Sequence, residues 1–144
     1  MNIRHVLAQK GGQVYTVDPD QTVREALAIL AARNVGALVV VDPRNRPIGI
    51  ISERDIVRAA VSDEEVFGRP VRRLMTRELI VAAPEDDLRV VAHTMTERRI
   101  RHLPVVMGER LVGIVSIGDI VKAQRDEYEG EIDILEARVA SEHP

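Results

Sequence analysis

The chain repeats one pattern of apolar and polar positions. In its first half, a short extended run at 13–17 is followed by apolar residues at helical spacing, namely Val23, Ala26, Leu27 and Leu30. Two Val- and Ile-rich runs come next, at 37–41 and 48–51, and a turn that contains proline separates them, which is typical of paired strands. A second helix is predicted to begin at Ser52. The first half therefore predicts the order β-α-β-β-α.

The second half shows the same order 64 or 65 positions later. Extended runs are expected at 79–83, 103–107 and 111–115, and a closing helix from Ser116. The apolar helix face keeps the spacing of the first copy, with Leu88, Val91, Ala92 and Met95. The offset changes by one residue in the turn after the middle strand, where an insertion is tolerated. The predicted fold class is α/β (α+β), built from two copies of one unit.

Helix-start signals and polar stretches set the predicted boundaries. Thr22 with Glu25 has the spacing of a capping box, and Asp87 holds the equivalent position in the second copy. Val-rich runs suit strands that are covered on both faces, so the two copies are expected to pack against each other. Short amphipathic turns precede the copies at 3–7 and 71–75. We expect repeat 1 with its lead-in helix at 1–62, a linker at 63–70, repeat 2 at 71–123 and a helical extension at 124–144.

Composition narrows the classes of function. With 45% apolar and 30% charged residues, the chain is typical of soluble globular proteins. Its net charge of −3 and its three aromatic residues provide neither the positive face nor the stacking platform of a nucleic-acid-binding protein. No apolar stretch would span a bilayer, and the N-terminus lacks a signal-peptide pattern, so a cytoplasmic protein away from membranes is expected. The absence of cysteine excludes disulfides and thiolate chemistry.

Three motifs resemble the CBS-domain family. Gly49-Ile-Ile-Ser-x-x-Asp55 returns as Gly113-Ile-Val-Ser-x-x-Asp119, and Arg101-His-Leu-Pro104 precedes the second copy. Together with the capped helices and the Met75-Thr76 opening of repeat 2, they are similar to the small proteins of this family that consist of a repeat pair, or Bateman module, over about residues 3–123. The resemblance implies pseudo-twofold packing, a homodimer, and clefts that bind an adenine nucleotide such as AMP, ADP, ATP, NAD or S-adenosylmethionine.

The same resemblance implies roles for individual residues. Asp55 and Asp119 would accept hydrogen bonds from ribose hydroxyls, while Ser52 and Ser116 would face phosphate at helix starts, where unpaired N–H groups favour an anion. The alternative is that each Ser-x-x-Asp is only a helix-capping box. Gly49 and Gly113 are expected to let the ligand approach the backbone. The nucleotide-contacting residues implied are Lys10, Thr16, Val17, Ala37, Ile50, Ser52, Arg54, Asp55, Arg101, His102, Pro104, Ile114, Ser116 and Asp119.

Basic residues distinguish the two expected clefts. Arg54, Arg101 and His102 are expected near the phosphates, and His102 would bind anions better as the pH falls through its ordinary pKa of about 6.5. The alternative for Arg101 and its neighbours Arg98 and Arg99 is a solvated helix end. Repeat 1 has Gly36-Ala37 where repeat 2 has Arg101-His102, so we expect one tight and one weak site. The segment Lys10-Gly11-Gly12 either approaches a phosphate or forms only a turn.

The remaining signals concern catalysis and assembly. The four histidines, His143 included, are scattered, so we expect no metal ligands, and no nucleophile motif predicts a catalytic residue; whether magnesium accompanies the ligand stays open. Val121, Tyr128 and Leu135 are seven apart, a stripe that either zips two subunits together or folds back. We expect no enzyme and no required cofactor, but a nucleotide sensor that signals to a separate partner protein. The alternatives are a ligand-independent dimerisation scaffold and, third, a nucleotide-converting enzyme.

Overall fold

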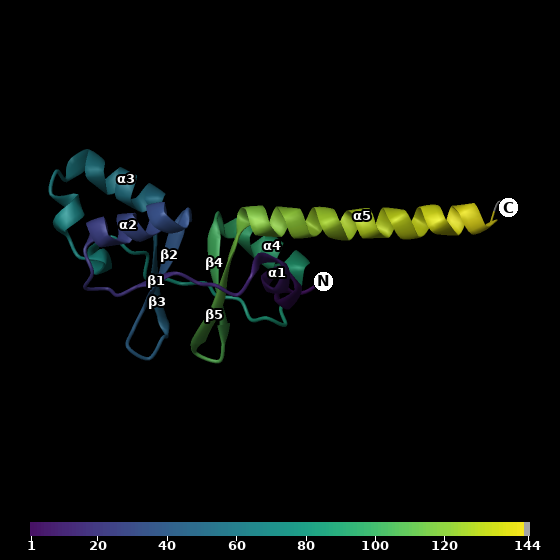
Figure 1. Ribbon diagram of the computed structural model, residues 1–144, viewed down its shortest axis with the longest axis horizontal. Helices are drawn as coiled ribbons and strands as arrows, with labels where there is room; N and C mark the ends of the chain where they lie inside the picture. Colours follow the sequence, from purple (N-terminus) through teal and green to yellow (C-terminus); the bar gives the residue numbers. More distant parts are fainter. Residues whose placement is uncertain (143–144) are drawn as a thin grey trace.

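The computed structural model describes residues 1–142, which form two α/β lobes side by side with one long helix projecting from the second lobe (Figure 1). The mixed α/β class predicted from the sequence is confirmed. In chain order the elements are α1 (Ile3–Lys10), β1 (Thr16–Val17), α2 (Val23–Arg33), β2 (Ala37–Val41), β3 (Pro47–Ser52), α3 (Glu53–Ser62), η1 (Val66–Gly68), η2 (Val71–Arg73), α4 (Leu88–Arg98), β4 (His102–Met107), β5 (Arg110–Ser116) and α5 (Ile117–Glu142).

The two repeats contain unequal sheets. In the first, β1 is parallel to β2, and β2 is antiparallel to β3. The second sheet is the antiparallel β4–β5 hairpin. The extended run expected at 79–83 forms no strand, because only Ala82 pairs, in a single bridge to Val105. The reason is local: the backbone N–H of Ala83 donates to the Asp86 carboxylate at 2.8 Å, and the next residue, Pro84, has no N–H to offer a neighbouring strand.

The helix caps read from the sequence are present. The Thr22 hydroxyl accepts a hydrogen bond from the Glu25 N–H at 3.1 Å, and the Glu25 side chain accepts one from the Thr22 N–H. Asp87 caps α4 by accepting from the Arg89 N–H at 3.1 Å. The predicted apolar faces of α2 and α4 are buried, apart from Leu27, which is half-buried. Propensity and tertiary packing therefore agree for these two helices.

Each repeat has its own core, but the lead-in segments are exchanged. Ile3 and Val6 of α1 are buried in the core formed by repeat 2. In return, Val71 of η2 is buried in the core of repeat 1, with Leu74 and Met75 packed against it. The helix that precedes repeat 1 in the sequence thus packs on repeat 2, and the start of repeat 2 packs on repeat 1. This exchange ties the two lobes together.

Helix α5 leaves the body of the protein (Figure 1). Ala123 is still buried, but every residue from Tyr128 to Ala140 is exposed, including Ile132, Leu135 and Val139. Of the two alternatives left open by the sequence, the one in which this helix folds back on its own chain is therefore wrong for the described residues; positions 143 and 144 of the predicted extension lie outside them. Although α5 is long, it carries too many charges to cross a bilayer, and none of the other helices within 1–142 is long and apolar enough either.

Candidate functional site

Two clefts lie between the repeats. The larger, which we call cleft A, has a volume of about 810 Å³ and opens at the start of α3. The smaller, cleft B, has a volume of about 560 Å³ and opens at the end of β5. Gly36, Ala37 and His102 line both, so the two clefts meet at these three residues. Cleft A is also lined by Ile50, Ser52, Glu53, Arg54, Asp55, Val57, Arg58, Thr76, Glu78, Ile80, Arg98, Arg99, Ile100 and Arg101.

The clefts are built from equivalent positions of the two repeats. Gly11, Gln13 and Tyr15 of cleft B lie 65 positions before Thr76, Glu78 and Ile80 of cleft A. The same offset relates 34–37 to 99–102, and an offset of 64 relates Ile50 and Ser52 to Ile114 and Ser116. The internal repeat therefore gives each chain two related but chemically distinct sites.

Both Ser-x-x-Asp motifs cap a helix. Ser52 Oγ accepts from the Asp55 N–H at 3.2 Å, and Asp55 Oδ2 accepts from the Ser52 N–H at 2.9 Å. Ser116 and Asp119 make the same two contacts at 3.1 and 2.8 Å. The capping interpretation is thus confirmed in both repeats. Among the described residues, however, neither aspartate uses its Oδ1, so one acceptor oxygen remains at each helix start.

Lys10 makes cleft B unlike cleft A. Its Nζ donates to Asp119 Oδ2 at 2.7 Å and to the Ile114 carbonyl at 2.9 Å. Although burial raises the pKa of Asp119, the hydrogen bonds from Lys10 and the Ser116 backbone outweigh it and hold that pKa below its ordinary value. The position equivalent to Lys10 in the second repeat is Met75. Asp55 therefore lacks the cation that occupies Asp119.

The two motif glycines serve packing and not ligand approach. A Cβ atom on Gly49 would lie 2.5 Å from Met75 Sδ, and one on Gly113 would lie 2.7 Å from Leu7 Cδ2. The expectation that these glycines open the backbone to a ligand is therefore wrong. The space is filled by side chains of the exchanged lead-in segments, which need glycine to lie this close to the strand.

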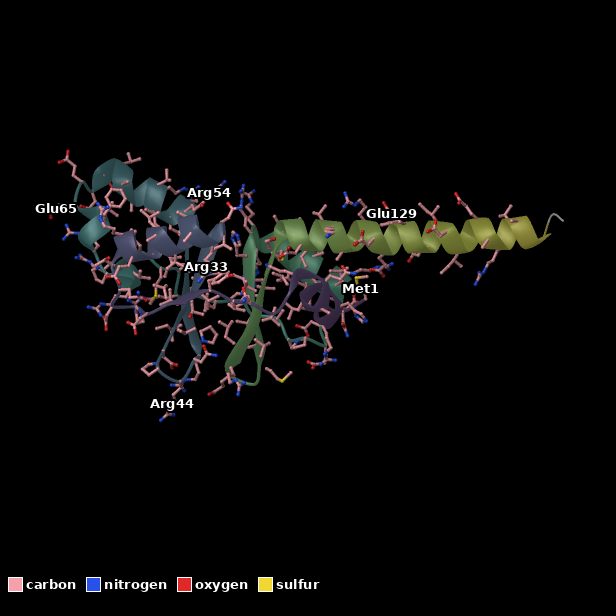
Figure 2. All side chains as sticks on the ribbon, viewed as in Figure 1. Met1, Arg33, Arg44, Arg54, Glu65 and Glu129 are labelled. Atoms are coloured by element: carbon pink, nitrogen blue, oxygen red, sulfur yellow. The ribbon has the colours of Figure 1, made fainter. Side chains whose placement is uncertain are left out.

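Arginines concentrate in cleft A. Five of them line it, against the three carboxylates of Glu53, Asp55 and Glu78. Within residues 1–142, the only charged residue that lines cleft B is Lys10, which is already paired with Asp119. Figure 2 shows Arg54 between α3 and the upper end of β4. Three of the five arginines were not among the predicted contacts; for Arg58 a signal was present, because it is four residues after Arg54 and so shares its helix face. Arg98 and Arg99, regarded from the sequence as a possible solvated helix end, are exposed and yet line the cleft.

The structure brings together most, but not all, of the residues predicted to contact the nucleotide. Val17 and Pro104 are buried and line neither cleft, because Val17 belongs to the first core and Pro104 lies in β4 beside Ala82. Thr16 in β1 and Asp119 in α5 line neither cleft as well. Ala37, Ile50, Ser52, Arg54, Asp55, Arg101 and His102 meet in cleft A, and Lys10, Ala37, His102, Ile114 and Ser116 meet in cleft B.

His102 lines both clefts, and its pKa is shifted. Burial, followed by the positive charge of Lys10, lowers its pKa below the ordinary value of 6.5. The expectation that it titrates at its ordinary pKa is therefore wrong for the ligand-free protein. Within residues 1–142 no three His, Asp or Glu side chains are placed to hold a metal ion; His143 lies outside the described residues.

Solved structures with the same fold include ligand complexes. A CBS-domain pair of 27% identity, with a TM-score of 0.79 over 88% of this chain and 98% of its own, was solved with 5′-methylthioadenosine and S-adenosylmethionine. The protein CBSX2, 25% identical, was solved with AMP; its TM-score is 0.74 over 88% of this chain and 98% of its own. An inosine-5′-monophosphate dehydrogenase of Methanocaldococcus jannaschii is 33% identical over 113 residues, which are 78% of this chain but 22% of the enzyme.

Family membership follows from three matches. The CBS domain model matches residues 6–62 and 71–126. The mitochondrial CBS domain-containing protein CBSX3 of Arabidopsis thaliana is 39% identical over 125 residues, which are 83% of this chain and 61% of that protein. The crystal structure of a CBS-domain protein from Agrobacterium tumefaciens, 36% identical, has a TM-score of 0.82 and covers 86% of this chain and 99% of its own. The chain therefore belongs to the CBS-domain family and carries a pair of CBS repeats.

Proposed function

We propose that this chain is a regulatory module that binds an adenine nucleotide in cleft A and signals its occupancy to a partner protein. The observation that carries the proposal is the start of α3. There a capped helix N-terminus and the uncommitted Oδ1 of Asp55 face a cleft of about 810 Å³ between the repeats. A helix start favours a phosphate, and a carboxylate oxygen suits the hydroxyls of a ribose.

The remaining walls of cleft A suit the other parts of such a ligand. Ala37, Ile50 and Ile80 provide apolar surface for a base, while Arg54 and Arg101 provide donors for phosphate. The complexes of related CBS pairs with AMP, and with methylthioadenosine and S-adenosylmethionine, support an adenosine-containing ligand. Of the candidates AMP, ADP, ATP and NAD, each presents a base, a ribose and phosphate to these walls.

Signalling requires that the nucleotide bind one conformation of the repeat pair better than another. Residues of both repeats line cleft A, so a bound nucleotide bridges them and changes their relative orientation or stiffness. We further propose a homodimer, which would convert this change into a new arrangement of two modules. The partner protein that responds to this change would be a separate chain, and the module itself would perform no catalysis.

A ligand-independent dimerisation scaffold is the second candidate. The observation that favours it is that both Ser-x-x-Asp pairs are complete capping boxes and so have a structural role without any ligand. The scaffold would keep its assembly state and its melting temperature in the presence of nucleotides.

A thermal-shift series separates the two candidates. AMP, ATP, NAD, S-adenosylmethionine and GTP are each added to the purified protein, and its oligomeric state is followed by sedimentation. A ligand at about 100 times its Kd that binds only the folded state stabilises it by about 2.7 kcal/mol. The sensor predicts a rise in Tm with adenine ligands and none with GTP. An unchanged Tm with every ligand would favour the scaffold.

A further inference from the structure

We infer that cleft A is specific for a nucleotide that carries a chain of phosphates, and that its arginine cluster, Arg54, Arg58, Arg98, Arg99 and Arg101, is the specificity determinant. This inference rests on the proposed function and deepens it, because it selects one chemical class among adenine ligands. AMP, with one phosphate, and S-adenosylmethionine, which carries a positive sulfonium, would bind such a cluster more weakly than ADP or ATP.

The first observation is that these arginines lack partners. Among the described residues, no side chain of the cluster donates a hydrogen bond or forms an ion pair within the protein. Arginines elsewhere do pair: Arg46 with Asp42 at 2.7 Å, Arg69 with Asp63 at 3.2 Å and Arg89 with Glu131 at 3.8 Å. The five guanidinium groups outnumber the three carboxylates that line the same cleft, so the cleft has an excess of positive charge, which a ligand of several negative charges would neutralise.

The second observation is the contrast with cleft B. Positions equivalent to Arg54, Arg99 and Arg101 are Gly118, Asn34 and Gly36 in the other repeat, while Arg58 corresponds to Lys122, which lines neither cleft. The position equivalent to Arg98 is Arg33, whose guanidinium stacks on Tyr15 with 5.0 Å to the ring centroid. Among the residues that the structure describes, the same scaffold therefore builds one cleft lined by five guanidinium groups and one lined by none. Helix architecture does not require the cluster, so a ligand accounts for it better.

The third observation is how the cluster is distributed. Arg54 and Arg58 come from the first two turns of α3, while Arg98, Arg99 and Arg101 come from the end of α4 and the residues before β4. The cluster therefore approaches the ligand from both repeats. A single phosphate at the helix start would engage only part of it, whereas a chain of phosphates would be contacted along its length by bidentate guanidinium groups.

The test is a calorimetric series of adenosine, AMP, ADP and ATP, in buffer with chelator so that no metal ion bridges the phosphates. We expect the Kd to fall about tenfold for each added phosphate, because each gains at least one charge-assisted hydrogen bond. The triple variant Arg54→Gln/Arg99→Asn/Arg101→Gln should reduce the gain from AMP to ATP to less than about threefold and leave the adenosine affinity unchanged. At position 99, which has φ 54°, asparagine is the residue that repeat 1 uses in the same left-handed conformation.

The matched control is Arg44→Gln/Arg110→Gln/Arg125→Gln, which removes the same charge outside the clefts and should keep the full gain. Figure 2 shows Arg44 in the hairpin turn at the opposite end of the lobe from Arg54. Inorganic tripolyphosphate should bind at least about tenfold more weakly than ATP, since it lacks the adenosine. If adenosine and AMP bound but ATP bound no more tightly than AMP, this inference alone would be overturned. An equal loss of the gain from AMP to ATP in the control variant would overturn it as well. If tripolyphosphate bound as tightly as ATP, or if no adenine ligand bound at all, both this inference and the proposed function would be overturned.

Discussion

The Lys10 ammonium lies 2.7 Å from Asp119 Oδ2, an ion pair between residues 109 positions apart. It joins the end of α1 to the start of α5. In the other repeat the equivalent of Lys10 is Met75, and Asp55 has no cation in that place. Both aspartates thus cap their helices, but Asp119 is also paired with a lysine of its own chain, whereas Asp55 faces an open cleft.

Lys10→Met should lower the free energy of unfolding by about 1 kcal/mol or less, because both side chains are partly exposed, at 30% and 25%. The pKa of Asp119 is depressed in the folded protein, so the pair stabilises it above the unfolded pKa near 3.9 and loses this effect as the pH falls through the lower folded value. Urea unfolding at pH 7 and pH 3 measures the difference. Arg4→Met, which breaks the exposed pair with Glu85, is the control and should have a smaller effect. A loss as large at pH 3 as at pH 7 would contradict the ion-pair explanation.

Gly49→Ala should destabilise the protein by about 1–3 kcal/mol, since its Cβ would lie 2.5 Å from Met75 Sδ. Gly68→Ala, with no atom within 4 Å of the new Cβ, is the control. Thermal unfolding of Gly49→Ala, Met75→Ala and the double variant forms a cycle. In the double variant, Met75→Ala should recover part of the stability that Gly49→Ala loses. Strictly additive losses would mean that the glycine matters for some other reason than contact with Met75.

The pH dependence of stability should report His102. Because burial and Lys10 lower its pKa, the folded state binds fewer protons than the unfolded state as the pH falls below about 6.5. His102 therefore contributes stability above that pH and loses the contribution on acidification. Urea unfolding of the ligand-free protein at pH 7.5 and 5.5 should show a larger decrease for the native protein than for His102→Gln. His93→Gln, at an exposed position of α4, should leave the decrease unchanged.

Gly130→Ala should stabilise the projecting part of α5 by about 1 kcal/mol, since nothing lies within 4 Å of the new Cβ and alanine favours a helix over glycine. Amide hydrogen exchange of residues 131–140 should slow by about fivefold. Ala137→Gly should speed it by a similar factor. If neither substitution changed the exchange, helix propensity would not control the opening of this part of α5, which would contradict the prediction.

The sequence predicted the local structure well, because helix caps and hydrophobic periods are local signals. The capping boxes at Thr22, Ser52 and Ser116 and the four longer strands lie where the pattern placed them. A periodic pattern shows which face of a segment is buried but not which core receives it. The burial of Ile3 in repeat 2 and of Val71 in repeat 1 could therefore not be predicted from the sequence.

The same limit applies to the clefts. Both helix starts were found from two motifs, but the pairing of Lys10 with Asp119 depends on the exchange of α1, and the convergence of Arg58 with Arg99 depends on how the repeats face each other. The role of the motif glycines was predicted wrongly. A glycine in a strand indicates that another group lies close to the backbone, but the sequence does not tell whether that group is a ligand or a neighbouring side chain.

The central claim, that cleft A binds an adenine nucleotide through Asp55, is tested most directly by calorimetric titration of AMP into three proteins: the native chain, Asp55→Asn and Asp119→Asn. Asparagine keeps an acceptor for the helix cap, so both variants lose the same type of group at equivalent positions. The account predicts that AMP binds the native chain, that Asp55→Asn weakens binding by about tenfold or more, and that Asp119→Asn changes it by less than about twofold. Equal effects of the two variants, or no binding of AMP to the native chain, would contradict it.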